Sequence, residues 1–221
     1  MNEITIHSGE SFERVFLNEP SVNLLIIQEA GSRVKIHVLN MPDDISEYRD
    51  IEISNRISVE QRGEGCETEI YGLAFLHGDE SVKTETHVTH AVGGGTSNQL
   101  IKFVLDGKAH GHFVGDLKIA QDAQKTEAHQ TNRNLVLSET AEMRTQPRLE
   151  IYADDVQATH GASTGQLDES ALFYMQQRGL DKQKARQLLI GAFMKDVIGA
   201  ISDQYSDIRE QLLDAVDGEI E

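Results

Sequence analysis

Residues Pro147–Leu180 read PRLEIYADDVQATHGASTGQLDESALFYMQQRGL, and within them a strand pattern changes abruptly to a helical one. Strand-forming side chains come first, followed by the turn residues ADD at 153–155 and a second extended run at 156–159. We expect His160-Gly161 to end that run in a tight turn. Asp168 suits a helix N-cap and Gly179 a helix stop. The chain should therefore consist of strands up to about residue 166 and of helices beyond it.

Short apolar-rich runs separated by turn residues fill the chain before this stretch. In RVKIHVL, at 33–39, Val34, Ile36 and Val38 alternate with polar residues, which is the period of a β-strand. Turn signals recur at intervals of about eight to twelve residues, as in all-β proteins. Only 3 prolines occur against 18 glycines, a balance that favours repeated short strands over a large α/β enzyme.

Helical periodicity is confined to the part of the chain after residue 168. Asp181 is the expected N-cap of one helix, and Ile208, Leu212 and Val216 follow at four-residue steps on another. The apolar face predicted for the first of these helices consists of Leu188, Leu189, Ala192, Phe193, Val197 and Ile201.

The net charge of −17 argues against nucleic acid as a partner, because phosphate binding requires clustered Lys and Arg. The single cysteine, Cys66, excludes an intramolecular disulfide and fits a reducing cytosol. No signal peptide is visible, and no apolar run approaches the roughly 20 residues that a membrane helix needs. We therefore expect a cytoplasmic protein without a membrane partner.

Periodicity alone leaves a β-sandwich and a β-solenoid open. Weakly similar units recur around histidines 23, 19 and 31 residues apart, namely His87, His110, His129 and His160. The first two spacings fit one coil of a solenoid.

A family resemblance favours the solenoid. The elements IYADD, HGA and FYMQQRG in the stretch quoted above closely resemble the carboxy-terminal signature of SufD members of the SufB/SufD family, scaffold proteins of the SUF iron–sulfur cluster assembly system. The resemblance extends from about Thr84 to Ile201. It implies a mainly β fold, with a right-handed parallel β-helix over residues 1–166 and an α-helical subdomain over 167–221. The long amino-terminal helical region of the family is missing from this sequence, so we expect a short form.

The same resemblance singles out His160. It implies that this histidine lies at an interface with a SufB-like chain, beside Val156 and Thr159, and helps to hold a transient iron–sulfur cluster. A neutral imidazole is a suitable ligand for iron. Judged from the residues alone, a turn histidine bonded to backbone groups is the alternative. The resemblance puts the SufB-type cysteine position at Ala141, which places the chain on the SufD side of the family. SufD proteins often carry a further cysteine where this chain has Ala158, and that departure leaves metal ligation to His160.

Two readings stay open for the helical part. Its apolar residues, among them Leu172, Phe173 and Tyr174, could pack on the end of the solenoid, where an exposed coil must be covered. The resemblance implies in addition that this part docks a SufC-type ABC ATPase, and both can hold if one face packs inward and the other is presented. It further implies that the scaffold pairs either with a SufB-like chain or with itself.

Nothing in the sequence supports catalysis by this chain. The glycine-rich GGGTSN at 93–98 lacks the lysine of a phosphate-binding loop, and GASTG at 161–165 lacks the spacing of a serine elbow. His110 and His112 share one face of a strand and could hold a metal, so the alternative function is a histidine-based metal-dependent enzyme on a β scaffold. Cys66 has no evident activating neighbour and is expected to be structural.

Overall fold

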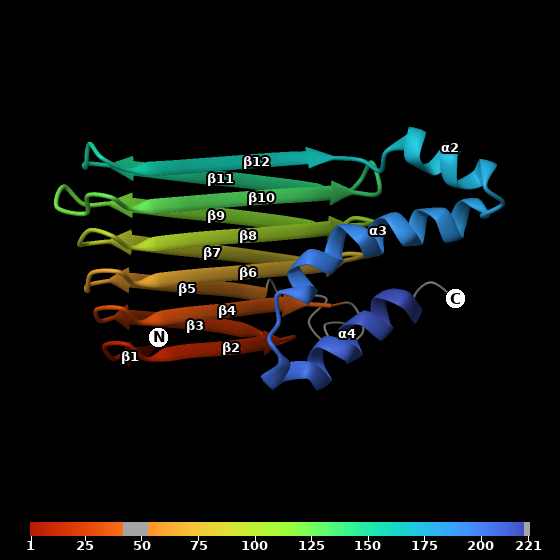
Figure 1. Ribbon diagram of the computed structural model, residues 1–221. Helices are drawn as coiled ribbons and strands as arrows, with labels where there is room; N and C mark the ends of the chain where they lie inside the picture. Colours follow the sequence, from red (N-terminus) through yellow and green to blue (C-terminus); the bar gives the residue numbers. More distant parts are fainter. Residues whose placement is uncertain (42–52, 219–221) are drawn as a thin grey trace.

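The computed structural model describes residues 1–41 and 53–218 (Figure 1). Its strands form two parallel sheets of six, and the chain alternates between them, one strand in each sheet per coil. This arrangement is a parallel β-solenoid, as predicted. The first sheet consists of β1 (Asn2–Ile6), β3 (Ser21–Gln28), β5 (Ile53–Gln61), β7 (Ser81–His90), β9 (His110–Ile119) and β11 (Glu142–Ile151). The second consists of β2 (Ser11–Leu17), β4 (Arg33–Asn40), β6 (Glu67–Leu76), β8 (Thr96–Leu105), β10 (Glu127–Val136) and β12 (Gln157–Gly165).

The register gives the length of a coil. Glu67 pairs with Thr96 and Thr96 with Glu127, steps of 29 and 31 residues. The histidine repeat proposed from the sequence is therefore wrong for His87, whose partner one coil on is Asp116 and not His110. The histidine spacings of 23 and 19 residues are shorter than a coil, so the matched letters fall at different positions of the repeat.

Apolar side chains from both sheets alternate into the interior and form one continuous core. Ile36 and Ile70, for example, are neighbours in register and almost completely buried. In the later coils the same inward position is polar: Gln99 and Gln130 follow Ile70 in register, and each is 2% exposed. The interior therefore changes character as the chain approaches β12.

The turns stack along the solenoid and use the left-handed backbone region. Gly94, for example, has φ +72°, and its N–H donates to the carbonyl of Gln124 in the next coil. Lys125 adopts φ +58° in that neighbouring turn, although it carries a side chain. A left-handed conformation is unfavourable for residues with a Cβ and natural for glycine.

We expect Lys125→Gly to raise the free energy of unfolding by about 0.5–1 kcal/mol, since relief of the left-handed strain outweighs the extra backbone entropy of glycine. Chemical denaturation would measure the change. Lys108→Gly is the matched control, because Lys108 lies in another turn with an ordinary φ. It should be neutral or destabilising, and an equal gain from both variants would refute the strain at Lys125.

Three α-helices and a short 3-10 turn follow the last strand: α2 (Glu169–Gln177), α3 (Lys182–Gly199), η2 (Asp203–Tyr205) and α4 (Ser206–Gly218). Both predicted N-caps are confirmed, since Asp168 accepts from the N–H groups of Ser170 and Ala171, and Asp181 accepts from that of Lys184. Within residues 1–41 and 53–218, no helix combines the length and apolarity required to cross a membrane.

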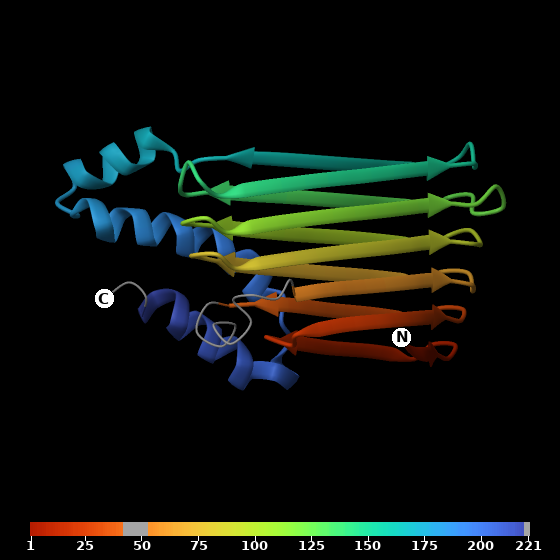
Figure 2. The same cartoon turned by 180° about the vertical axis from the view of Figure 1, so that it is seen from behind.

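The helices α3 and α4 pack against the outward face of the second sheet, not over the last coil (Figures 1 and 2). In β6, Ile70 and Leu76 point into the core, whereas Leu73 contributes to this second apolar cluster. From α3 the cluster receives Met194 and Ile198 together with Val197. Ala192, expected on the buried face, is exposed. Sheet and helices therefore share a second core beside the solenoid interior.

A buried lysine ties α3 to the sheet inside this second core. The Lys102 side chain is 3% exposed, and its Nζ lies 2.5 Å and 2.7 Å from the two carboxylate oxygens of Asp196. The same ammonium donates to the carbonyl of Phe193 and lies 4.5 Å from the centre of that ring. Its charge is thus compensated entirely by one turn of α3.

A buried histidine makes the stability of the solenoid depend on pH. His90 is fully buried, its Nε2 lies 2.8 Å from Ser97 Oγ, and burial lowers its pKa from 6.5 to about 4. The unfolded chain therefore binds a proton on this residue before the folded protein does. Stability supplied by neutral His90 is complete above pH 6.5 and is lost as the pH falls toward 4.

We expect the free energy of unfolding to fall by about 3 kcal/mol over that interval on account of His90 alone. At each pH, the free energy of unfolding of His90→Gln is subtracted from that of the wild type. The effects of the carboxylates are common to both proteins and cancel, so the difference reports His90. The difference should be constant above pH 7 and shrink below 6.5. A difference that does not vary with pH would contradict the assignment.

Candidate functional site

His160 lies in the middle of β12, and the tight turn expected at His160-Gly161 does not form. Gly161 continues the strand in register with Thr131, as His160 does with Gln130. The reason is tertiary: β10 offers a complete row of partners, and pairing with it favours an extended backbone over the local turn preference of glycine. The histidine is therefore held by a sheet.

The register also gives the direction of the side chain. Gln99, Gln130 and His160 are successive neighbours across β8, β10 and β12, and both glutamines are buried inside the solenoid. His160 occupies the same inward position one coil further, yet it is exposed because the described residues form no further coil above it. The imidazole is therefore presented at the open end of the solenoid core.

The end of the solenoid at β11 and β12 is uncovered. Among the described residues, β11 pairs only with β9 and β12 only with β10, which leaves one backbone edge of each strand without a sheet partner (Figures 1 and 2). Side chains along both strands are exposed or half-buried. Pro147, in the middle of β11, has no N–H to offer on that edge.

The neighbours expected around His160 divide between the two faces of the strand. Thr159 points outward, where its hydroxyl is hydrogen-bonded to His129 Nδ1 at 2.8 Å, and His129 Nε2 donates to Glu127 at 3.1 Å. Val156 is half-buried and packs against the interior core. Ala158 lies two residues before His160 and therefore on the same inward face. A cysteine at that position would stand beside the imidazole, and alanine leaves it without a thiol.

This geometry leaves the imidazole available to a ligand from outside. Within the part of the chain that the structure describes, no side chain or backbone group hydrogen-bonds to the His160 ring, and no three His, Cys, Asp or Glu residues gather as a metal site. A ring nitrogen of His160 can supply one ligand. Further ligands for a metal at this end would have to come from another molecule.

Helix α2 offers a second exposed feature, beyond the end of β12. Phe173 and Tyr174 are 62% and 59% exposed, whereas Leu172 is buried and anchors the helix from within. Arg178 lies over the Tyr174 ring and donates to its hydroxyl at 2.9 Å. The three residues were expected to act together at an interface, but only the two aromatic rings are presented to solvent.

The other residues singled out from the sequence are four histidines and the cysteine, all in the solenoid. His110 and His112 share the outward face of β9, as predicted, and line a small cavity with Ser81, Glu142 and Arg144. His87 and His90 lie on opposite faces, also as predicted, since His87 pairs with Asp116 on the surface and His90 is buried. Cys66 is fully buried, with its Sγ 3.1 Å from the carbonyl oxygens of Glu29 and Gly63, which fits a structural role.

Comparison with known proteins agrees with the fold and the sequence signature. Residues 21–193 match the family described as "SUF system FeS cluster assembly, SufBD core domain". The chain belongs to the SufBD family. The match begins well before Thr84, so the family pattern includes amino-terminal strands in which the resemblance was only faint.

The curated relatives are named either as SufD or as SufBD family proteins. The chain is 36% identical to "Iron-sulfur cluster assembly protein SufD" of Escherichia coli (strain K12) over 73% of its length and 38% of that protein. It is 38% identical to "Iron-sulfur cluster assembly SufBD family protein slr0076" of Synechocystis, over 88% of this chain and 40% of the relative. A Mycobacterium leprae family member is 34% identical over 75% and 44%, respectively. The chain thus spans about two fifths of the relatives it matches.

Sequence reasoning missed the residues that join the helices to the sheet. Glu13, His37 and Lys102 point outward from β2, β4 and β8 and are covered by the helical segment. The sequence contained only a faint sign that helices cover β6 and β8. The runs LAFL at 73–76 and FVL at 103–105 are continuously apolar, which is typical of strands buried on both faces.

Proposed function

We propose that this SufBD family member is a non-catalytic scaffold of iron–sulfur cluster assembly. It pairs through the open end at β11 and β12 with a SufB-like chain or a second copy of itself, and residues 168–216 dock a SufC-type ABC ATPase. The observation that carries the proposal is the exposed His160 at an inward position of an uncovered solenoid end. In this proposal the chain has two parts, a β-helix core at residues 1–166 and a helical subdomain at residues 167–221.

The open edge supports pairing with another chain. Strands β11 and β12 are ten and nine residues long, which is enough for another strand to pair along their open backbone edges. The outward residues of β11 include two acids, Glu142 and Glu150, and two bases, Arg144 and Arg148. This edge is locally neutral in a chain with a net charge of −17, so a second acidic chain can approach it without strong repulsion.

Pairing would also complete the environment of His160. A strand laid over β12 would bury the imidazole between the two solenoids, in the position that Gln130 holds one coil below. Iron–sulfur clusters usually take four protein ligands, mostly thiolates, and His160 can supply one of them. The cluster is thus a transient cargo shared at the interface, with the remaining ligands from the partner.

The exposed aromatic pair on α2 supports docking of a second protein. Large aromatic side chains are enriched at the centres of protein interfaces, and Phe173 and Tyr174 lie side by side in sequence with more than half of their surface in solvent. An ATPase bound there would supply the energy for rearranging the scaffold. This chain itself carries no phosphate-binding loop.

We expect His160→Ala to reduce cluster formation at least tenfold in a reconstitution with a SufB-like chain, the ATPase, iron and a sulfur donor. Its free energy of unfolding should change by less than about 0.5 kcal/mol, because the side chain is exposed. His110→Ala, an exposed histidine on the other sheet, is the matched control. Unchanged assembly in the His160 variant would remove this residue from the site.

We expect the double variant Phe173→Ser, Tyr174→Ser to lose the ATPase when the tagged protein is purified from its own cell extract and its companions are identified by mass spectrometry. The pair Asn2→Ser, Glu3→Ser is the control, since both residues are exposed on β1, far from α2 and from the open end at β11 and β12 (Figure 1). Loss of the ATPase from both variants, or from neither, would refute docking at α2. A SufB-like chain in the wild-type sample indicates a heteromer, and its absence a homodimer.

A further inference from the structure

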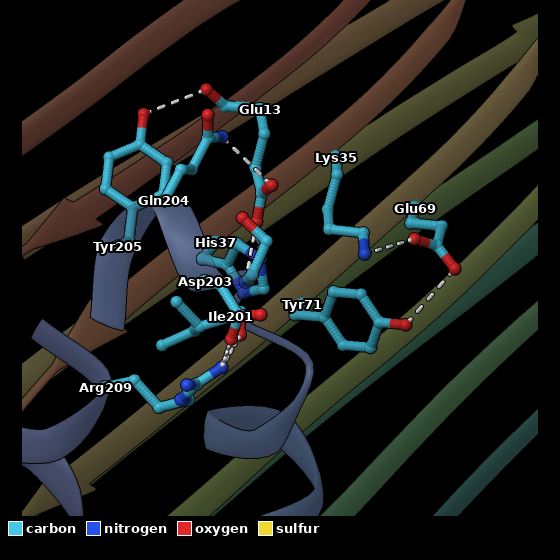
Figure 3. A network of polar contacts seen from close by, with 11 residues as sticks. Glu13, Lys35, His37, Glu69, Tyr71, Ile201, Asp203, Gln204, Tyr205 and Arg209 are labelled. Atoms are coloured by element: carbon cyan, nitrogen blue, oxygen red, sulfur yellow. Dashed lines mark hydrogen bonds and ion pairs between the residues drawn. The ribbon is translucent and has the colours of Figure 1, made fainter.

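The turn between α3 and α4 is fastened to the solenoid at one residue of β2. The backbone N–H of Ser202 donates to Glu13 Oε1 at 3.2 Å, and Gln204 Nε2 donates to Glu13 Oε2 at 3.0 Å (Figure 3). The Tyr205 hydroxyl donates to the backbone carbonyl of Glu13 at 3.0 Å. Side chain and backbone of a single glutamate thus hold three successive points of the turn.

A fully buried histidine supports the same carboxylate from below. His37 Nε2 donates to Glu13 Oε1 at 3.2 Å, and the ring stacks on Tyr71 with centres 5.2 Å apart. Its Nδ1 is buried and has no hydrogen-bond partner among the described residues. Because Nε2 carries the proton that Glu13 accepts, the neutral ring fits this site, and a second proton on Nδ1 would be buried without an acceptor.

The charged and titratable groups around His37 come from every element packed against it. Glu13 lies on β2, Lys35 on β4 itself, and Glu69 with Tyr71 on β6, where Glu69 accepts from Lys35 at 3.1 Å and from the Tyr71 hydroxyl at 3.3 Å. The helical segment adds Asp203 and Arg209, which pair with each other at 2.9 Å (Figure 3). The carboxylate of Glu13 is therefore the acid in direct contact with the ring.

These surroundings move both pKa values in the same direction. Burial lowers the pKa of His37 below 6.5, and the attraction of Glu13 offsets this only in part. Burial alone would raise the pKa of Glu13, but hydrogen bonds from Ser202, together with the nearby charge of Lys35, bring it below 4.5. At neutral pH the pair is therefore a neutral imidazole and a carboxylate.

Water reaches the edge of this contact without any movement of strands. An open cavity of about 740 Å³ lies on the outward face of β2, β4 and β6, and Glu13, Ser202 and Gln204 line it. The Glu13 side chain is 12% exposed, whereas that of His37 is closed off completely. Lifting the turn would connect the imidazole with this solvent.

We propose that Glu13 and His37 form a proton-operated latch, which releases the α3–α4 turn from the solenoid when His37 takes up a proton. The apolar cluster around Val197 and Ile198 keeps the helices in place, so release is local to residues 201–206. In the open state His37 meets water and titrates near its ordinary pKa of about 6.5. In the closed state it stays neutral at lower pH.

Linkage gives the size of the effect. Opening takes up one proton between pH 6.5 and the lower pKa of the closed state, so its equilibrium constant rises about tenfold for each pH unit of acidification. Stability that neutral His37 supplies to the closed turn is complete above 6.5 and is lost below it. Glu13 adds a second proton only below 4.5, so of these two groups His37 alone takes up a proton between pH 6.5 and 4.5.

Native-state hydrogen exchange followed by NMR tests the latch. After correction for intrinsic rates, protection of the Ser202 amide should fall as the pH drops below 6.5, with a slope of at most about tenfold per pH unit until the pKa of the closed state is reached. Amides in the middle of β8, such as Ile101, report on global unfolding, which frees His90 as well as His37, so their protection should fall more steeply than that of Ser202 over the same interval. An equal loss at Ser202 and Ile101, or no loss at Ser202, overturns the proposal.

Two substitutions locate the proton. His37→Gln keeps a side-chain N–H for Glu13 but cannot titrate, so protection of Ser202 should become independent of pH between 7.5 and 5. Glu13→Gln removes the charged acceptor and should lower that protection about tenfold or more already at pH 7.5. A pH dependence that persists in a folded His37 variant overturns the latch. If that variant does not fold, the comparison of Ser202 with Ile101 in the wild type and the effect of Glu13→Gln still test the proposal.

Discussion

Parallel pairing from coil to coil is the constraint on which the rest of this structure depends. Each strand obtains its backbone partners from the strands one coil before and after it, at steps of about 30 residues, so only the terminal coils are left with open edges. The two ends differ. Strands β1 and β2 are five and seven residues long, and short edge strands offer little to an incoming chain, whereas β11 and β12 have ten and nine. The long edges are the ones that carry His160.

The position of the helices follows from the same repeat. Because the outward side chains of β4, β6 and β8 become apolar toward the ends of the strands, α3 and α4 find their core on the side of the second sheet. Lys102 and Glu13 then fix α3 and the α3–α4 turn at two separate points. The helical segment therefore stabilises the flank of the solenoid and leaves its end open.

Local sequence rules predicted what is encoded locally. Asp168 and Asp181 are helix caps because capping requires only the residue and the next turn of chain, and the strands were recognised from alternation within a few residues. His160-Gly161 was mistaken for a turn because the partner strand that extends it lies 30 residues earlier in the sequence. The Glu13–His37–Ser202 cluster joins residues 24 and 189 positions apart, and no local pattern contains it. Such contacts become predictable only once the register is known.

The distribution of charge determines where this acidic chain can associate with another molecule. The excess of acids keeps such molecules apart over most of their surface, and association is favoured where the sign is balanced. On β11 the bases Arg144 and Arg148 balance the acids, and β12 contributes small uncharged residues around its histidine. In the latch, by contrast, Glu13 is kept ionised next to a neutral imidazole, and a single proton changes that balance. The open end at β12 and the latch at β2 lie at opposite edges of the second sheet, so a molecule bound at the open end would not contact the latch.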